Sequence, residues 1–200
     1  MANMCYNTIV FYGDSVCIKE LYSHIERIHR TNDDDKQHND YTMLAEAYNL
    51  NLAEAGWFMC LEDVDVENDK ITSFRFDTET KWVPKEEIFN AICKHYKGKI
   101  NYVYTAEEIG FKVFINTDTQ GIYFVDRYYV DGSGFLEPLY TDDWNEVKSL
   151  LKELYPDFKE EELTTDNLDK INSILRNSLP KCGEDDDNLV QVYKYEEELK

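Results

Sequence analysis

The hydrophobic and polar positions at the start of the chain change from a strand pattern to a helix pattern. Residues 8–12 are β-branched or aromatic, which favours a strand, and the Gly-Asp-Ser sequence at 13–15 supplies a turn and a helix N-cap. From Ile18 onward, apolar residues recur at spacings of three and four, which predicts an amphipathic helix to about residue 30. A strand therefore leads directly into a helix.

The same two patterns then follow each other again. A polar loop at 31–40 and a short helix between 41 and 52 precede an acidic segment at 62–70, which we interpret as a turn. Phenylalanines alternate with charged residues in 71–78, so this segment is predicted to be a second strand with one apolar face. A helix is expected over 84–98, because proline and acidic residues begin this segment and basic residues and glycine end it.

Three runs of strand-forming residues come next, at 100–105, 111–116 and 122–130, with short turns between them. Such turns connect neighbouring antiparallel strands, so the runs predict a β-meander. We expect its aromatic side chains to pack in a core rather than to form a binding platform, because only Lys112 and Arg127 interleave with them. The predicted core face contains Phe111, Val113, Ile115, Ile122, Phe124, Tyr128 and Val130.

The carboxyl-terminal part has helical periodicity. Thr141 or Asp143 is predicted to cap an amphipathic helix that ends before Pro156, and a second helix is expected from about Thr165 to near Pro180. After an acidic turn, the segment from Val190 to Tyr195 is expected to form an edge strand.

The order of these elements predicts an α+β fold of the ferredoxin-like type. We expect an antiparallel sheet with helices on one face, an extended β-meander and a C-terminal helical appendage. The ferredoxin-like domain is placed in residues 1–140, and an acidic helical appendage, packed on the same domain, in 141–200. A chain of 200 residues can bury a substantial core.

Charge excludes several kinds of partner. The chain has 41 acidic and 21 basic residues, a formal charge of -20, and no basic run. Direct binding to nucleic acid or to anionic lipid is therefore not expected. Residues 141–200 hold 17 acids and 8 bases, so the density of negative charge there is about twice that of the preceding residues.

Location and cysteine chemistry follow from other simple features. The first residues lack the basic start and apolar core of a signal peptide, and no apolar run is long enough to span a membrane, so we expect a cytoplasmic protein. The five cysteines stand singly, without Cys-x-x-Cys spacing, which favours reduced thiols over disulfides or a zinc site.

Two local sequences resemble a known family. MANMCYNTIVFYGD at 1–14 is similar to the Asn-rich opening strand of the YubB-like ferredoxin-like domain of plasmid and phage proteins. FRFDTETKWVPKEEIFNAICKHY at 74–96, followed by INYVYTAEEIGFKVF at 100–114, resembles its second half. The most specific parts are Thr80-Lys81-Trp82-Val83-Pro84 and Glu108-Ile109-Gly110.

The resemblance extends over about residues 1–132 and is weak in 31–68. It implies the ferredoxin-like fold and a mobile-element setting. No catalytic residues come with it.

Residue patterns typical of catalysis are missing from the sequence. We find neither a Gly-rich phosphate loop nor a Ser-His-Asp arrangement, and His24 and His29 are five residues apart, so they do not share a helix face as two metal ligands would. An alternative hypothesis is a small metal-dependent hydrolase or nuclease that uses carboxylates of the meander. Its metal or ligand site would contain Glu107, Glu108, Asp126, Asp131, Arg127 and Tyr129. A third interpretation makes the outer face of the meander a small-ligand or oligomer surface.

The acidic surface is the leading candidate for function. A folded chain of this size spans about 40 Å, and duplex DNA of that length carries about 24 negative charges, so the two are comparable. We therefore favour a non-catalytic interaction protein, a possible nucleic-acid mimic, that binds a basic protein partner without a cofactor. Acidity also confers solubility, and the sequence leaves both explanations open. The predicted partner-binding residues are Asp142, Asp143, Glu160, Glu161, Glu162, Asp185, Asp186 and Asp187.

Overall fold

The computed structural model describes residues 4–33, 40–52, 56–68, 70–132, 136–178 and 190–198. The chain divides into two compact units, one formed mainly by residues 1–118 and the other by residues 119–197. The observed division differs from the one expected after residue 140, because the residues before it supply strands to the sheet of the second unit. We describe each unit by itself.

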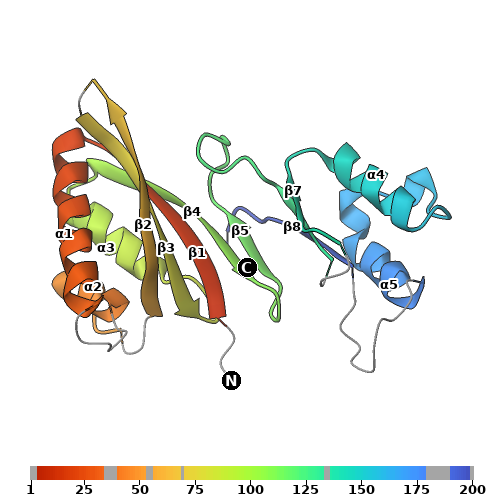
Figure 1. Ribbon diagram of the computed structural model, residues 1–200, viewed down its shortest axis with the longest axis horizontal. Helices are drawn as coiled ribbons and strands as arrows, with labels where there is room; N and C mark the ends of the chain where they lie inside the picture. The colour runs from red at the N-terminus through yellow and green to blue at the C-terminus, as the bar shows by residue number, and fades with distance from the viewer. Residues whose placement is uncertain are drawn as a thin grey trace. The chain divides into compact units, whose positions relative to one another are not determined.

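The first unit has the element order of a ferredoxin-like fold with additions (Figure 1). Helices α1, α2 and α3 cover one face of its sheet (Figure 1). Its elements are β1 (Met4–Gly13), α1 (Ser15–Asp33), α2 (Asp40–Ala47), β2 (Gly56–Glu67), β3 (Lys70–Lys81), α3 (Glu86–His95), β4 (Ile100–Glu108) and β5 (Val113–Asn116).

The strand order is β2-β3-β1-β4-β5, and every neighbouring pair is antiparallel. The strands that flank α1, β1 and β2, are separated by β3, which is the split β-α-β arrangement of the ferredoxin-like fold. Strand β5 extends the sheet beyond β4. The predicted fold class is therefore confirmed for this unit, as are the strand at 71–78 and the helix over 84–98.

Alternation along β1 builds the core of the first unit. Every second residue from Cys5 to Phe11 is buried, and Ile9 lies opposite Phe76 on β3 and Tyr104 on β4. Partners across a ladder share a face, so aromatic rings gather under the helices. The centroid of Phe11 lies 5.9 Å from that of Phe76. Each such buried ring stabilises the fold by about 2–3 kcal/mol.

The acidic segment that we interpreted as a turn is part of strand β2. Its pairing with β3 shifts register between Phe58 and Cys60, between Glu62 and Val64, and between Asp65 and Val66. Each bulge changes the face to which the next residues point, so no alternation of apolar and polar residues survives in the sequence. The prediction of a turn at 62–67 was wrong for this reason.

The meander prediction is confirmed only for its first two strands. Strands β4 and β5 pair from Thr105 opposite Asn116 to Glu108 opposite Val113. The expected third strand does not join them: residues 122–127 lie outside the strands, and β6 (Tyr128–Asp131) belongs to another sheet. The chain leaves the first sheet at a polar turn, in which the Asn116 side chain accepts a hydrogen bond from the backbone N–H of Asp118.

Two side chains that we expected in the core of the meander are exposed. Phe111 is 60% and Ile122 is 66% exposed. Phe111 lies in the turn between β4 and β5, where Lys112 has a φ of 56°, and the strand begins only at Val113. In the sequence, the alternation of apolar and polar residues therefore extends back into the turn, but in the structure the strand begins only after the turn.

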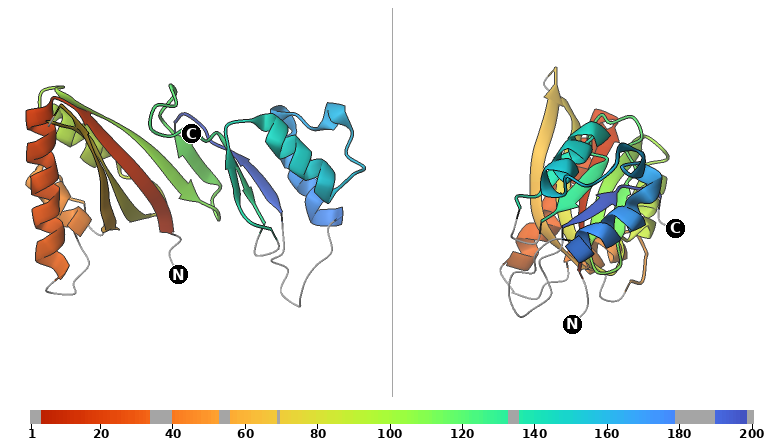
Figure 2. Two further views of the ribbon diagram at one scale, coloured as in Figure 1. Left: turned by 45° about the horizontal axis from the view of Figure 1, so that its top comes forward. Right: turned by 90° about the vertical axis from the view of Figure 1, so that its right-hand side faces the viewer.

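The second unit is a small three-stranded sheet with the order β7-β6-β8, covered on one side by two helices (Figure 2). Both helices and the final edge strand confirm their predictions. A separate core includes the fully buried Val130, Val147 and Leu151. The remaining elements are β7 (Leu139–Thr141), α4 (Trp144–Leu154), the 3-10 helices at Glu160–Glu162 and Thr165–Asn167, α5 (Leu168–Ser178) and β8 (Gln191–Lys194).

A helix side chain satisfies the outer edge of β8. Asn172 of α5 donates to the carbonyl oxygen of Val192 at 2.9 Å and accepts from its backbone N–H at 2.8 Å. An unpaired strand edge is a template for association with another strand, and the asparagine amide occupies one position of it. In the part of the chain that the structure describes, no helix is both long enough and apolar enough to cross a membrane.

Candidate functional site

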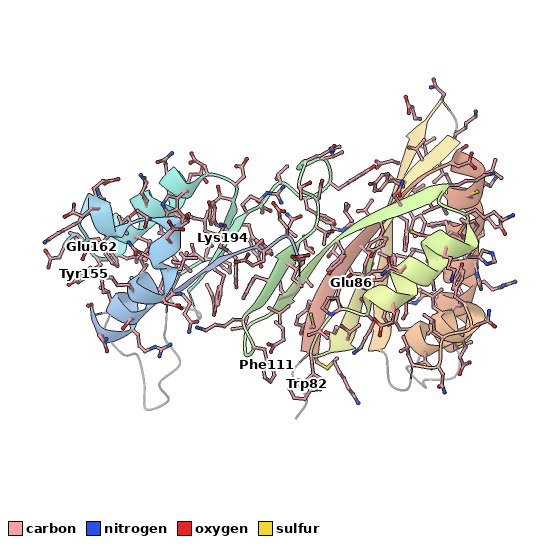
Figure 3. All side chains as sticks on the ribbon, turned by 180° about the vertical axis from the view of Figure 1, so that it is seen from behind. Trp82, Glu86, Phe111, Tyr155, Glu162 and Lys194 are labelled. Atoms are coloured by element: carbon pink, nitrogen blue, oxygen red, sulfur yellow. The ribbon has the colours of Figure 1, made fainter. Side chains whose placement is uncertain are left out.

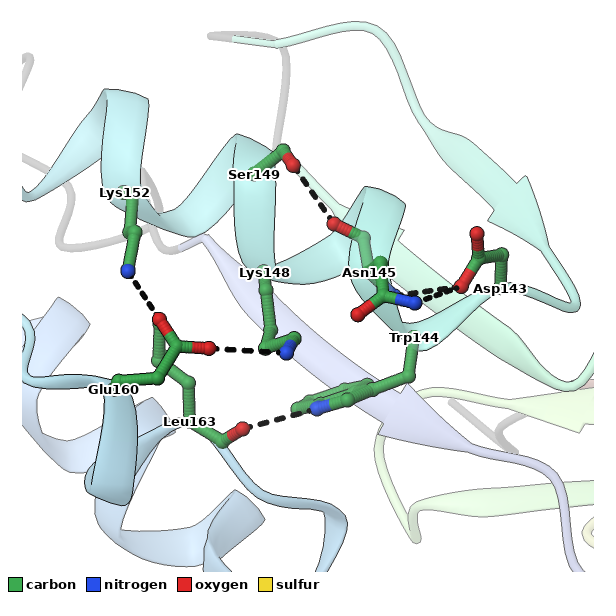
Figure 4. Close-up of polar contacts among 8 residues, drawn as sticks. All are labelled: Asp143, Trp144, Asn145, Lys148, Ser149, Lys152, Glu160 and Leu163. Carbon is green, nitrogen blue, oxygen red and sulfur yellow. Dashed lines mark hydrogen bonds and ion pairs between the residues drawn. The ribbon is translucent and has the colours of Figure 1, made fainter.

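One of the acids predicted to bind a partner caps a helix. The Asp143 carboxylate accepts hydrogen bonds from the backbone N–H of Asn145 at 2.8 Å and from its side-chain amide at 3.0 Å (Figure 4). This satisfies donors that would otherwise be unpaired at the start of α4, and its negative charge complements the positive end of the helix. The Trp144 indole N–H donates to the carbonyl oxygen of Leu163 at 3.0 Å, which fixes the same turn against the following loop.

Two more of these acids are paired with lysines. The Glu160 carboxylate accepts hydrogen bonds from Lys148, at 3.0 Å, and from Lys152 (Figure 4). Lys170 donates to Glu162 at 3.0 Å. These lysine hydrogen bonds hold the pKa of both carboxyls below the ordinary value for glutamate. Lysines of the same unit therefore balance the charges of both carboxylates.

The other predicted acids have different surroundings. Asp142 and Glu161 are exposed. Burial and the neighbouring Asp142 raise the pKa of Asp126, so these two carboxylates repel each other. The positions 185–187 lie outside the described residues.

An acidic groove of about 720 Å³ lies beside the start of α4. The segment before β7 and the first residue of β7 contribute Glu137 and two half-buried leucines, and α4 with its cap contributes further acids and Leu150. All three carboxylates of the groove are exposed, and none of the side chains that line it is basic. We call this site the acidic groove, and it is lined by Leu136, Glu137, Pro138, Leu139, Asp143, Asn145, Glu146, Ser149 and Leu150.

Helix periodicity explains why the groove keeps its charge. Lys148 and Lys152 are four residues apart, so they share one side of α4, where Glu160 binds both. Glu146 and Leu150 are also four apart and share the side that lines the groove. The Glu146 carboxylate accepts a hydrogen bond from the Thr141 hydroxyl at 2.7 Å, which holds it without neutralising it. The helix thus separates its bases from the groove.

The residues proposed for a metal site are not brought together as one group. Glu107 and Glu108 are consecutive on β4, so they point to opposite faces of the sheet. Asp126 and Asp131 belong to the second unit. Among the described residues, no group of three or more histidine, cysteine, aspartate or glutamate side chains has a metal-binding arrangement.

The remaining residues of that set support the second sheet. The backbone of Arg127 donates to the carbonyl oxygen of Thr141 and accepts from the N–H of Tyr195. Tyr129 is buried in a ladder of rings, with its centroid 4.7 Å from that of Tyr140 and 5.8 Å from that of Tyr193. The packing explanation therefore applies to Tyr129.

A second acidic pocket, of about 350 Å³, lies on the face of the first sheet opposite the helices. Glu107, Asp77 and the hydroxyls of Tyr6, Thr8 and Thr105 line it. Glu79 is the main cause of a raised pKa for Tyr6. The Nε of Arg75 lies 3.6 Å from Oδ1 of Asp77, so this pocket has a positive charge beside it that the acidic groove lacks.

The two segments that carry the family resemblance meet at an exposed aromatic pair (Figure 3). The ring centroids of Trp82 and Phe111 are 5.1 Å apart, and Trp82 has a φ of 71°. Glu108 is buried and accepts hydrogen bonds from the backbone N–H groups of Gly110, at 3.0 Å, and Phe111. Glu108 therefore shapes the turn that presents Phe111.

Sequence reasoning missed the acids that matter most for the groove. Glu137 precedes a proline in a short irregular segment, and Glu146 is one of many helical acids. The sequence signal that could have found these acids was the spacing of the two lysines on α4. It places both bases on one side of the helix and leaves Glu146 on another. Locating the partner of those lysines at Glu160 required the tertiary fold.

Comparison with known proteins gives one family match. A family model described as a ferredoxin-like domain in Api92-like protein matches residues 60–121. This range includes both motifs of the resemblance and runs from within β2 to three residues past Asp118, where the main segment of the first unit ends, so it agrees with the ferredoxin-like fold there. No curated protein and no solved structure matched the chain. What the chain resembles is therefore a ferredoxin-like domain family over about a third of its length.

Proposed function

We propose that the protein is a non-catalytic acidic interaction protein, and that a basic segment of a partner protein binds in the acidic groove. The observation that carries the proposal is the composition of the groove: three carboxylates and three leucines line it, without a basic side chain. A lining that combines leucines with carboxylates suits an amphipathic peptide that presents apolar residues and lysine or arginine.

The charge of the whole chain supports the same partner. A formal charge of -20 attracts basic proteins over distances of about a Debye length, about 8–10 Å at ordinary ionic strength. The magnitude of this net charge is comparable with the charge on a DNA segment of similar length. This is consistent with a partner that otherwise binds nucleic acid. We therefore propose a basic partner. A groove that binds nucleic acid would explain why the partner is basic.

A mobile-element origin is part of the proposal. The YubB-like resemblance implies plasmid or phage proteins, and the match to a ferredoxin-like domain family overlaps the motifs that carry it. Proteins of mobile elements benefit from occupying the basic surfaces of host proteins that act on nucleic acid. We propose that this chain acts in the cytoplasm in that way.

A matched pair of double variants tests the groove against overall charge. Glu137→Gln with Glu146→Gln removes two groove charges, and Glu153→Gln with Asp157→Asn removes two exposed charges of the same unit that do not line it. The probe is a labelled amphipathic peptide with leucines on one helix face and lysines on the other, followed by fluorescence anisotropy. Glutamine at 146 keeps an acceptor for the Thr141 hydroxyl.

The groove variant is expected to weaken peptide binding by at least about tenfold, because hydrogen bonds to charged groups contribute about 1.5–3 kcal/mol each. The control variant should weaken it by less than about threefold, mainly at low salt. Equal losses in the two variants would mean that only total charge acts, and the proposed site would be wrong.

A further inference from the structure

A pocket of about 410 Å³ opens where α1 meets the carboxyl ends of α2 and α3 in the first unit. It is separate from the acidic groove and from the pocket on the opposite face of the sheet. Its volume is in the range of small-ligand sites, about 300–1,000 Å³. Its chemistry comes from Glu20, His24 and Arg27 of α1, Tyr48 after α2, and His95 and Tyr96 at the end of α3.

Local structure brings these side chains to one place. Residues 20, 24 and 27 of α1 are four and three apart, so they lie on the same side of the helix. Helix α2 ends where the backbone N–H of Tyr48 bonds the carbonyl oxygen of Ala45 at 3.1 Å. The Tyr48 ring then lies between the two imidazoles, with centroids 5.9 Å from His24 and 5.3 Å from His95.

Three basic side chains, Arg27, His24 and His95, line the pocket together with one acid, Glu20. Burial lowers the pKa of His24, and both Arg27 and His95 lower it further, while Glu20 is the one group that raises it. Although the whole chain has a charge of -20, basic groups repel each other at this pocket.

We propose that this pocket binds a phosphomonoester dianion, with Arg27, His24 and His95 around the phosphate and the rings of Tyr48 and Tyr96 against its organic part. The planar guanidinium matches two phosphate oxygens at once, and a protonated imidazole donates from either ring nitrogen. A bound dianion turns the repulsion among the three basic groups into attraction. Glu20 faces the same space and accepts from a hydroxyl of the organic part.

Binding of a dianion also couples to protonation. The bound charge favours the protonated form of His24, whereas the phosphomonoester itself loses its second charge below about pH 6, so binding is strongest slightly above that pH and weakens on either side. The groups that face the imidazoles are Glu20 and Arg27 from α1, Tyr48 from the end of α2, and Tyr96 after α3. Burial is the main cause of a raised pKa for both tyrosines, so they stay neutral through this range.

NMR titration of the full chain tests the proposal, with inorganic phosphate and phenyl phosphate as probes and sodium acetate as the monoanion control. At about pH 6.5, where phenyl phosphate is mostly a dianion, it should shift the imidazole signals of His24 and His95 saturably and bind more tightly than inorganic phosphate, and affinity should fall by about pH 8. Arg27→Gln should weaken binding about tenfold or more. Arg30→Gln is the matched control, since Arg30 on the same helix pairs with Glu26 at 2.7 Å and does not line the pocket.

Two results would overturn the assignment. One is a response to phosphate that is no larger than that to acetate at equal ionic strength. The other is an Arg27→Gln variant that still binds phenyl phosphate like the Arg30→Gln variant. If Arg27→Gln loses its helical circular dichroism, His95→Gln takes its place with the same expected loss. Peptide binding at the acidic groove is measured separately and does not depend on either outcome.

Discussion

Replacing Leu151 by alanine is expected to loosen the second unit and to leave the first unchanged. Leu151 on α4 is fully buried among residues of the second core, and the hydrophobic cluster of the first unit shares no residue with it. Removing most of a buried leucine side chain costs about 3 kcal/mol, because the cavity closes only in part. Since 1.4 kcal/mol is a factor of ten, opening of the second unit becomes about a hundredfold more frequent.

Hydrogen exchange followed by mass spectrometry measures this directly. Peptides from α4, α5 and β6 should exchange about a hundredfold faster in Leu151→Ala, and peptides from β1, β3 and β4 at the rate of the original protein. Phe89→Ala is the reciprocal control, because Phe89 is fully buried in the core of the first unit. If Leu151→Ala accelerates exchange in β1 and β4 by the same factor, the two units open as one, and the reasoning from separate cores is refuted.

Three further predictions concern single groups. Asp143→Ala should lower the free energy of unfolding of the second unit by about 1 kcal/mol in urea denaturation, through loss of the α4 cap, and Asp142→Ala should not. Burial raises the pKa of the fully buried Cys5 to about 12 and that of the partly buried Cys93 to about 11, so iodoacetamide at about pH 8 should label Cys5 only after unfolding and Cys93 slowly in the native protein. Rapid labelling of Cys5 in the native protein would contradict its burial. Calorimetric titration with Mg²⁺ should give no stoichiometric binding, whereas a defined stoichiometry would revive the hydrolase hypothesis.

Elements with strong periodicity and clear ends were predictable from the sequence. The helix over 84–98 has acids in its first turn, bases in its last and buried residues at Ile88 and Ile92, as its pattern indicated. The same holds for α4, whose cap at Asp143 was one of two expected. In each case local preferences and tertiary packing agree, so either one alone leads to the same element.

Strand pairing was less predictable, because it depends on residues far apart in the chain. Residues 128–131 have the pattern of a strand, but nothing in that pattern says whether they pair with the strand before or with segments that come later. The structure pairs Tyr129 with Tyr140 and with Tyr193, the latter more than sixty positions away. The short turns suggested pairing with the preceding strand, but β6 pairs with β7, which follows it, and with β8, which lies far along the chain.

The candidate site could be predicted only in its general character. A count of acids led to the hypothesis of a basic partner, but the contribution of each acid depends on what lies beside it. Glu160 has two lysines next to it, and Glu146 has a hydroxyl. The neighbours of each acid come from other helix turns or other elements. No single sequence pattern therefore identifies them.

Total charge and local charge should act on different steps of partner binding. Attraction by the net charge guides the approach of a basic protein and is screened by salt, so exposed acids such as Glu153 mainly affect the association rate. In the proposed complex, carboxylates of the groove would form close contacts only after docking, so Glu137 and Glu146 should mainly affect the dissociation rate. Stopped-flow and dissociation measurements with the lysine peptide separate the two. A groove variant that changes only the association rate, with the salt dependence of the control variant, would show that the groove contributes charge to the surface but no contact to the complex.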